Sequence, residues 1–190
     1  MLLAAPKYGN DDPAVDAVVA KVHELVCFSS LGKSGKYGLD RFTIVNINNK
    51  GNTMLGRFTG ATPNGRPARD SLSNGNNPTA GMDKNGVTAF LNSLLKMRTD
   101  IHAGVVQNMK FSKEVFRDMR DTVVKPLLDA YFQGGGAQAM ISVVGREDLE
   151  NAMREPEKYG NLIVRVGGFS ARFVELDRDI QTDILNRTMY

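Results

Sequence analysis

Two adjacent glycines near the C-terminal end of the sequence stand in a setting that could carry chemistry. They follow a short apolar stretch and precede an aromatic residue, in the segment Arg165-Val166-Gly167-Gly168-Phe169-Ser170-Ala171. Glycine is common where the backbone takes a positive φ or where another segment passes close by, so a plain tight turn is the usual explanation of such a pair. A glycine-rich loop after a strand can also present backbone N–H groups to an anion.

A nucleotide-binding loop needs a spacing that this segment lacks. Residues 165–173 contain no Gly-x-Gly-x-x-Gly fingerprint, no Lys-Ser/Thr pair closes the loop, and no amphipathic helix begins directly after it. The second glycine cluster, Gly134-Gly135-Gly136, is followed by a predicted strand rather than by a helix. Neither glycine cluster is therefore expected to bind phosphate.

The segment around the two glycines resembles the glycine-radical signature of the glycyl radical enzymes. This is the family of pyruvate formate-lyase, glycerol and diol dehydratases, choline trimethylamine-lyase and arylacetate decarboxylases. The resemblance extends over essentially the whole chain, because further blocks match in family order. These blocks are Lys7 to Asp12, Thr62 to Arg66, Asp83 to Ala89, Pro156 to Val164 and Gln181 to Thr188.

The resemblance implies that Gly168, the glycine directly before the aromatic residue, carries a glycyl radical. Phe169 stands where the family commonly has Tyr, and Gly167 where it commonly has Ala or Ser. The supporting loop is formed by Arg165, Val166, Gly167, Phe169, Ser170 and Ala171. An unpaired electron on Cα is shared between the amide nitrogen and the carbonyl only if Cα becomes planar, and a side chain would hinder that geometry. In this family dioxygen cleaves the backbone at the radical, so the resemblance also implies anaerobic function.

The family's chemistry also needs groups that this sequence lacks. The glycyl radical oxidises a cysteine to a thiyl radical, which takes hydrogen from a small-molecule substrate, and in the lyases a nearby Glu serves as base. That cysteine loop lies upstream of the region covered here, and Cys27 lacks its motif. The resemblance therefore implies a large partner chain that supplies the cysteine and the base.

The radical itself implies a second partner. In this family a separate activating enzyme takes the hydrogen from the glycine, using S-adenosylmethionine and an iron–sulfur cluster that belong to the activator. The glycyl radical on Gly168 is then a modification of this chain, which is expected to bind no other cofactor and no metal. For activation the glycine loop must leave the barrel, and we expect hinges at Gly160 and near Asp177.

The expected function is that of the radical-bearing small subunit of a two-chain glycyl radical lyase, inactive alone. One alternative is an autonomous glycyl radical cofactor, a spare part that repairs an oxygen-cleaved enzyme. Another is an interaction module without radical chemistry. The match back to Lys7 favours the subunit, since replacing a cleaved tail requires much less chain. The substrate stays open, as does the choice among dehydration, decarboxylation and carbon–heteroatom cleavage.

The elements that must position the glycines alternate between strand and helix, which is typical of an α/β fold. Asp12 and Pro13 begin the first helix, as N-cap and first helical residue, and an apolar stripe follows at helical spacing. The stripe consists of Val15, Val18, Val22, Leu25 and Val26. The further predicted strands cover 42–47, 105–111, 140–144 and 162–166. The further predicted helices cover 88–97, 113–132 with a break at Pro126, a stretch from Glu147 to before Pro156, and a last helix capped by Asp177.

By resemblance, the fold is the C-terminal portion of the family's ten-stranded α/β barrel, completed by a partner chain. The prediction is a single domain over 1–190, with 160–177 as the glycine radical loop region. Residues 29–86 are rich in Gly, Asn and Pro, with a turn expected at Thr62-Pro63-Asn64-Gly65, and so much loop indicates a missing partner. Within this stretch, seven basic residues of 33–69 face one acid, Asp40, which suits a solvated loop or, alternatively, an acidic partner surface.

Composition is typical of one ordinary globular protein. The 190 residues are 42% hydrophobic, and the net charge of +3 gives no nucleic-acid signature. The single cysteine excludes an intrachain disulfide, and Cys27 is interpreted as a small buried residue because nothing near it in the sequence suggests a lowered thiol pKa. His23 and His102 are interpreted as surface or core residues. The sequence shows no membrane span and no signal peptide, so we expect a cytoplasmic protein that binds neither membrane nor nucleic acid.

Overall fold

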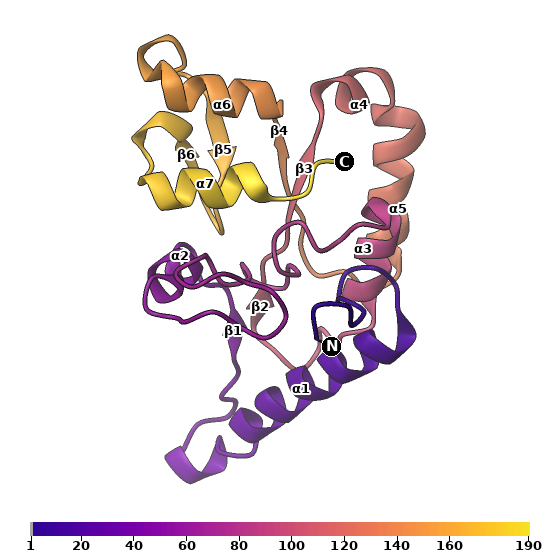
Figure 1. The fold of residues 1–190 in the computed structure, drawn as a ribbon. Helices are drawn as coiled ribbons and strands as arrows, with labels where there is room; N and C mark the ends of the chain where they lie inside the picture. The colour runs from indigo at the N-terminus through magenta and orange to yellow at the C-terminus, as the bar shows by residue number, and fades with distance from the viewer. Residues whose placement is uncertain (1) are drawn as a thin grey trace.

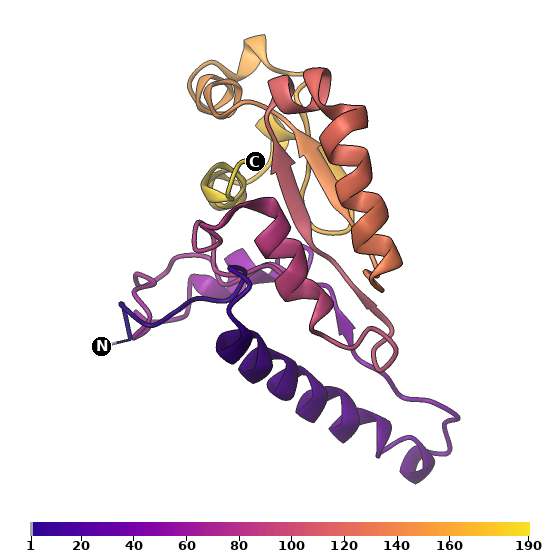
Figure 2. The same cartoon turned by 90° about the vertical axis from the view of Figure 1, so that its right-hand side faces the viewer.

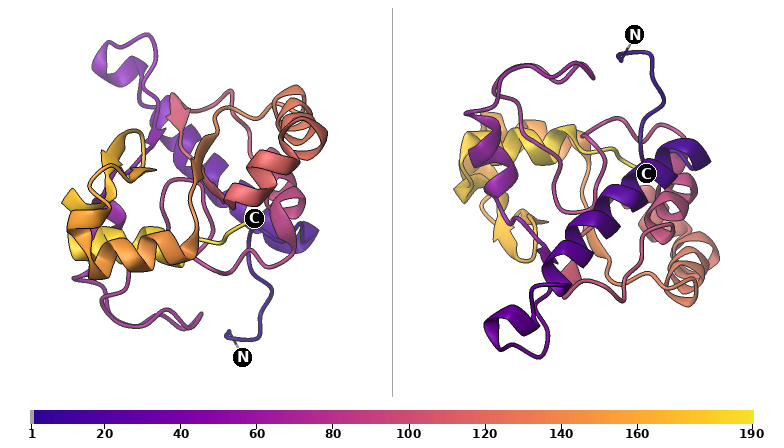
Figure 3. Two further views of the ribbon diagram at one scale, coloured as in Figure 1. Left: turned by 90° about the horizontal axis from the view of Figure 1, so that it is seen from above. Right: turned by 90° about the horizontal axis from the view of Figure 1, so that it is seen from below.

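The first helix, α1 (Pro13–Leu31), begins where the sequence predicts. The computed structural model describes residues 2–190. The Asp12 side chain accepts hydrogen bonds from two backbone N–H groups of the first turn at 3.0 and 3.2 Å, and Pro13 takes the first helical position. The helix crosses the underside of the molecule (Figure 3), and together with the loop after it extends beyond the rest of the chain (Figure 2).

Four short strands run parallel in two pairs (Figure 1). β1 (Val45–Asn46) pairs with β2 (Gly104–Val105), and β3 (Asn108–Phe111) pairs with β4 (Met140–Val143). Parallel neighbours need long crossover connections, and here the chain between paired strands passes through helices. This arrangement confirms the predicted α/β class.

The strands are shorter than the sequence predicts. The predicted strand 105–111 is divided into β2 and β3 at Val106, whose carbonyl accepts a hydrogen bond at 2.9 Å from the backbone N–H of Asn76 in a neighbouring loop. The predicted strand 42–47 retains only two residues, because β2 offers only a two-residue partner for ladder pairing. The expected turn at 62–65 is confirmed by a 3.0 Å hydrogen bond from the Gly65 N–H to the Thr62 carbonyl.

Helices form much of the chain that connects the strands. The predicted break at Pro126 is confirmed: a five-residue π-helical turn separates two helices, and Pro126 lies in the first turn of the second. The helices after α1 are α2 (Gly51–Gly56), α3 (Gly86–Leu95), α4 (Lys113–Asp118), α5 (Lys125–Gln133), α6 (Arg146–Arg154) and α7 (Arg178–Asn186). Asp177 precedes α7 as predicted, but its side chain makes no capping hydrogen bond. Its backbone carbonyl accepts from the first turn instead.

An antiparallel hairpin carries the two glycines. β5 (Ile163–Arg165) confirms the core of the predicted strand 162–166, and β6 (Ser170–Arg172) pairs with it, which the sequence analysis did not predict. The hairpin lies beside β4, and the backbone N–H of Arg165 donates to the Ser142 hydroxyl at 3.0 Å. β4 therefore supports the hairpin from one side.

Two separate clusters of buried apolar side chains hold the molecule together. The first cluster joins α3, β3 and α5 through Phe90, Leu91, Leu94, Met97, Met109, Phe111, Val124 and Tyr131. The second cluster joins α6, the hairpin and α7 through Val144, Leu149, Ala152, Val164, Val166, Phe173, Ile180 and Ile184. In Figure 1 the elements of the second cluster gather at the upper left, apart from α3 and α5. The predicted loop region 160–177 belongs to the second cluster.

The C-terminal tail, 187–190, ties the second cluster back to the first. Tyr190 exchanges backbone hydrogen bonds of 2.8 Å with Lys110 and Ser112 beside β3, and its ring lies 6.0 and 5.9 Å from the rings of Phe90 and Phe111. Within residues 2–190, no helix combines the length and the apolarity that a membrane span requires.

Candidate functional site

The two glycines form the tip of the hairpin between β5 and β6. The backbone N–H of Val166 donates to the Phe169 carbonyl at 2.9 Å, which leaves Gly167 and Gly168 as the two central residues of a tight turn. Gly168 has a φ of +99°, whereas Gly167 does not have a positive φ. A positive φ at this position favours glycine, which has no Cβ. Gly168 therefore meets a backbone requirement for glycine.

Each glycine is in close contact with the segment after β1. Gly167 is buried, and a Cβ at this position would lie 2.7 Å from the Asn49 carbonyl oxygen. Gly168 is exposed, and a Cβ there would lie 3.0 Å from Asn49 Oδ1 and 3.7 Å from Ile47 Cγ2. The Gly168 N–H also contacts the Met140 sulfur at 3.1 Å. The tip is thus held between β4 and the 47–49 segment while Gly168 stays open to solvent.

The other predicted loop residues divide into anchors and exposed groups. Val166 is buried in the second cluster, and Ala171 is half-buried against it. Arg165, Phe169 and Ser170 are exposed, and the Arg165 guanidinium donates to the Ser170 hydroxyl at 2.8 Å. The apolar anchors fix the hairpin, and the polar and aromatic groups beside Gly168 remain available to another molecule.

A buried ion pair holds the strand that leads into the glycines. The Arg187 guanidinium donates to the carbonyls of Arg165 and Val166 at 3.0 and 2.8 Å, and to Asp183 Oδ2 at 2.8 Å. The Asp183 carboxylate also accepts from the Asn52 amide at 3.1 Å. No chemical motif in the sequence connects these three side chains, and only Asp183 and Arg187 lie within the resembling block 181–188.

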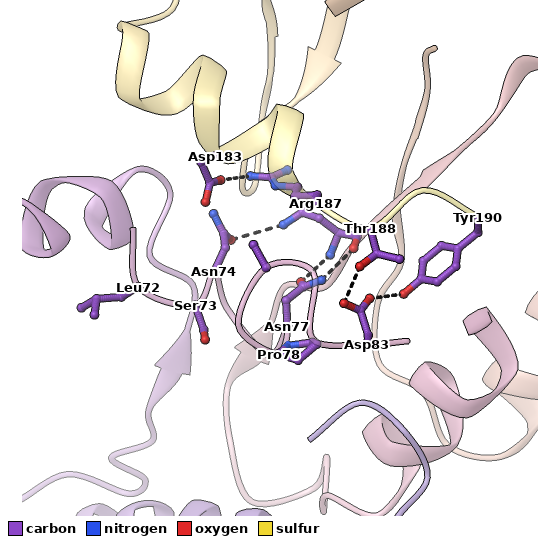
Figure 4. Close-up of a pocket in the computed structure, with 12 residues that line it drawn as sticks. Leu72, Ser73, Asn74, Asn77, Pro78, Asp83, Asp183, Arg187, Thr188 and Tyr190 are labelled. Atoms are coloured by element: carbon purple, nitrogen blue, oxygen red, sulfur yellow. Dashed lines mark hydrogen bonds and ion pairs between the residues drawn. The ribbon is translucent and has the colours of Figure 1, made fainter. Parts of the chain in front are cut away.

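A small polar pocket lies between this ion pair and the C-terminal tail (Figure 4). Asp83 accepts hydrogen bonds from the Thr188 hydroxyl at 2.5 Å and from the Tyr190 hydroxyl. Burial, with the Asp83 charge in addition, raises the pKa of Tyr190, so the phenol stays a donor. The pocket volume of about 20 Å³ has room for about one water. It is a structural junction and too small for a substrate.

The cysteine and the histidines lie elsewhere. Cys27 is buried as predicted, and burial raises the pKa of its thiol. Its contact with His23, one helical turn earlier, was not predicted: the His23 Nε2 lies 3.7 Å from the Cys27 sulfur. His102 is buried with its ring centroid 5.3 Å from that of His23, and burial lowers its pKa. Cys27 is not among the contacts of Gly168 in the described residues. Residues 2–190 also contain no group of three His, Cys, Asp or Glu side chains placed to hold a metal ion.

Comparison with known proteins links this geometry to a family. The sequence model described as "Glycine radical" matches residues 72–174, which include the hairpin, β4 and α6. Among solved structures, the glycerol-bound B12-independent glycerol dehydratase from Clostridium butyricum is 34% identical, with a TM-score of 0.93 over 100% of this chain and 24% of that one. A glycyl radical enzyme from Archaeoglobus fulgidus is 34% identical, with a TM-score of 0.91 over 98% and 24%.

A third structure shows the same relation. Hydroxyproline dehydratase from Clostridioides difficile, with trans-4-hydroxy-L-proline bound, is 30% identical, with a TM-score of 0.92 over 99% of this chain and 24% of that one. The chain thus spans about a quarter of the length of the structures it matches. These matches confirm the resemblance drawn from the sequence and the α/β fold expected from it. The chain belongs to the glycyl radical enzyme family, of which it represents the C-terminal glycine radical region.

Proposed function

We propose that this chain is the radical-bearing subunit of a two-chain glycyl radical enzyme. Gly168 stores the radical and exchanges it with a cysteine on a large partner chain. The observation that carries the proposal is the hairpin tip, where an exposed glycine with a φ of +99° is fixed by its neighbours inside the matched glycine radical region.

The chemistry is a sequence of hydrogen-atom transfers. A separate activating enzyme removes one α-hydrogen atom from Gly168 and leaves the unpaired electron on Cα. Gly168 Cα then takes a hydrogen atom from the S–H group of the partner's cysteine, which becomes a thiyl radical while the glycine is restored. The reverse transfer at the end of the cycle returns the radical to Gly168. Supporting this role, the solvent-exposed position of Gly168 leaves its α-hydrogens accessible from outside this chain.

Exposed apolar surface supports a large partner. The side chains of Val18, Val22 and Leu25 on α1 are 63%, 57% and 68% exposed, although they form the apolar stripe recognised in the sequence. Val45 and Ile47, in and next to β1, are also exposed. Exposed apolar side chains gathered on one face of a helix are typical of a protein interface. The partner chain would cover α1 and β1 and bring its cysteine to Gly168.

The basic segment 33–69 is consistent with the same partner, but fewer of its charges are available to a partner than its seven basic residues suggest. Arg57 pairs with Asp179, Arg66 is buried against two backbone carbonyls, and Arg41 donates to the Asp100 carbonyl. Lys33, Lys36, Lys50 and Arg69 are exposed. Part of the segment therefore serves this chain's own fold, and the exposed lysines are free to meet acidic groups.

The reaction class follows from the relatives. Two of them are named as dehydratases, of glycerol and of hydroxyproline. We therefore expect lyase chemistry, and small hydroxylated molecules are the first substrates to test. Turnover requires the partner, because no cysteine of this chain contacts Gly168 in the part of the chain that the structure describes.

The test is anaerobic electron paramagnetic resonance after incubation with a reduced activating enzyme and S-adenosylmethionine, followed by exposure to air and intact-mass analysis. A doublet radical signal, with cleavage at Gly168 in air, is the expected result. Absence of both, with an activator proven on another glycyl radical enzyme and with the large chain present, would refute radical storage.

A binding experiment separates the subunit from a repair protein. A subunit binds a large chain that ends before the glycine loop, whereas a spare part prefers a full-length enzyme that dioxygen has cleaved. We expect the first preference, because the exposed surface on α1 lies far along the chain from the hairpin and a replaced tail would not need it.

A further inference from the structure

The Arg187 side chain occupies a special position relative to the radical loop. Its guanidinium donates to the carbonyls of Arg165 and Val166 at 3.0 and 2.8 Å, and these are the last two carbonyls before the glycine pair. A planar guanidinium can direct several N–H groups at fixed angles, which lysine cannot do. Arg187 therefore holds the entry strand of the loop at two points with one side chain.

Asp183 fixes Arg187 from one helical turn earlier. The two groups meet at 2.8 Å, and their side chains are 12% and 5% exposed. Asp183 also accepts from the Asn52 amide at 3.1 Å. Hydrogen bonds between ionised groups are stronger than neutral ones, and removal of one partner from a buried pair leaves the other charge uncompensated. The ion pair is thus costly to break by mutation.

The same network reaches the other side of the glycine loop. The Asn74 amide contacts Asn52 Oδ1 and the Asn49 carbonyl at 3.3 Å each, and the Asn49 carbonyl is the group against which Gly167 packs. Figure 4 shows Asp183 and Arg187 close to Asn74. One connected set of polar contacts therefore grips the hairpin strand on one side and the surface on which the glycines rest on the other.

We propose that Arg187 and Asp183 form a latch that keeps the glycine loop docked. The latch acts through the loop and touches neither the radical carbon nor a substrate, so both are positioning residues. It favours the docked loop, which transfer to a partner cysteine requires, and opposes the released loop, which an activating enzyme requires. The consequences for radical transfer and for activation rest on the proposed function, whereas the latch itself is a property of this chain.

The latch is tested first without any partner. In the full chain, Arg187→Lys keeps the charge near Asp183 but loses the forked contact to the two carbonyls. We expect hydrogen–deuterium exchange at the amides of residues 166–169 to become about tenfold faster, as loss of a charge-assisted hydrogen bond implies. Amides of α3, in the first cluster, should exchange at the wild-type rate.

Arg178→Lys is the matched control. Arg178 begins α7, the helix that carries Asp183 and that Arg187 directly follows; it is exposed and contacts the Met153 carbonyl rather than the loop. Its variant should leave exchange at 166–169 unchanged. Asp183→Asn should resemble Arg187→Lys, and the double variant should add little to either. Equal loop exchange in Arg187→Lys and the wild type would overturn the latch, as would a uniform increase over the whole chain.

The second test measures activation and turnover in the assembled enzyme. Arg187→Lys should acquire the radical signal faster than the wild type while kcat falls, and a merely structural defect would lower both together. That joint loss would overturn the latch. If the wild type takes up no radical while exchange at 166–169 still responds to Arg187→Lys, the proposed function fails and the latch stands.

Discussion

At the scale of single residues, the two adjacent glycines are required for different reasons. Gly168 takes a φ of +99°, which a residue with a side chain adopts only at a cost in energy. Gly167 has ordinary backbone geometry, but the Asn49 carbonyl leaves no room for a Cβ. The structure adds a packing cost at that position, although the α-hydrogens of Gly168 are untouched.

Gly168→Ala is expected to abolish the radical and to lower the free energy of unfolding by about 1–2 kcal/mol, the cost of a left-handed backbone for an L-residue. Gly135→Ala is the matched control, since Gly135 has a φ of +97° with open space around its Cα. It should be destabilised by a similar amount and keep the full radical signal. Spin counts and urea unfolding measure the two effects, and a radical in Gly168→Ala would refute the assignment.

Gly167→Ala tests the packing of the loop separately from radical formation on Gly168. We expect it to keep a radical on Gly168 while unfolding more easily, because the new Cβ must displace the Asn49 carbonyl from 2.7 Å. Intact mass after exposure of the activated variant to air gives the cleavage site. Cleavage shifted to residue 167 or lost altogether in a folded variant would show that the radical had been placed on the wrong glycine.

At the scale of secondary-structure elements, Lys110 on β3 caps α7. It is 3% exposed, and its Nζ donates to the carbonyls of Ile184 and Leu185 at 3.1 and 3.0 Å, near the helix C-terminus where positive charge is favourable. Burial, together with the charges of Arg187 and Arg146, nevertheless lowers its pKa to about 8. The folded protein therefore binds this proton less tightly than the unfolded chain, whose lysine has a pKa of about 10.4.

This difference predicts that stability rises with pH. Below about pH 8 the Lys110 amine is protonated in both states, and burial of its charge destabilises the folded state in full. Between about pH 8 and 10 the folded state releases this proton while the unfolded chain still holds it. We expect the free energy of unfolding to increase by about 1–2 kcal/mol from pH 7.5 to 9.5. Urea unfolding at several pH values measures the increase, with Lys110→Met as the reference. Parallel pH curves for the two proteins would contradict the origin assigned to the effect.

The exposed stripe of α1 predicts a variant that separates stability from assembly. Leu25→Ser should change the free energy of unfolding by less than about 0.5 kcal/mol, because the side chain is 68% exposed. It should weaken binding to the large chain by about tenfold if Leu25 is a central interface residue. Ala14→Ser, at the exposed start of the same helix, serves as control. Titration calorimetry with unchanged affinity for Leu25→Ser would remove α1 from the interface.

At the scale of the whole molecule, the loop region 160–177 is packed against its surroundings. Leu162, Val164, Phe173 and Leu176 pack in the second cluster with α6 and α7. Hinges at Gly160 and near Asp177 would open this cluster. Release of the loop at these hinges would also break the contacts of Arg187 with the carbonyls of Arg165 and Val166.

The C-terminal tail holds the second cluster against the first, which can be tested. Tyr190→Phe removes the hydroxyl that donates to Asp83 but keeps the ring between Phe90 and Phe111. The lost hydrogen bond is worth about 1 kcal/mol. We expect hydrogen exchange in α6 and α7 to quicken while α3 keeps its wild-type protection. Equal acceleration in both parts would show that the tail stabilises the protein only globally.

Much of the local structure follows from the sequence because its causes are local. Asp12 and Pro13 start α1, Pro126 divides the helical region, and the apolar stretches around 140–143 and 163–165 form strands. The residues around Gly168 resemble the family's glycine radical signature, and the family comparison confirms the resemblance. Each of these features is encoded by residues within a short stretch of the sequence, so it can be predicted from the sequence alone.

What the tertiary structure alone decided involves residues that are distant in the sequence. The contacts that hold the loop join Arg187 to Val166, Asp183 to Asn52 and Gly167 to Asn49. The outward position of the α1 stripe likewise depends on what packs against the helix, because helical spacing predicts an apolar face but not the direction in which it points. Long-range packing selects these partners, and no local preference of the chain encodes them.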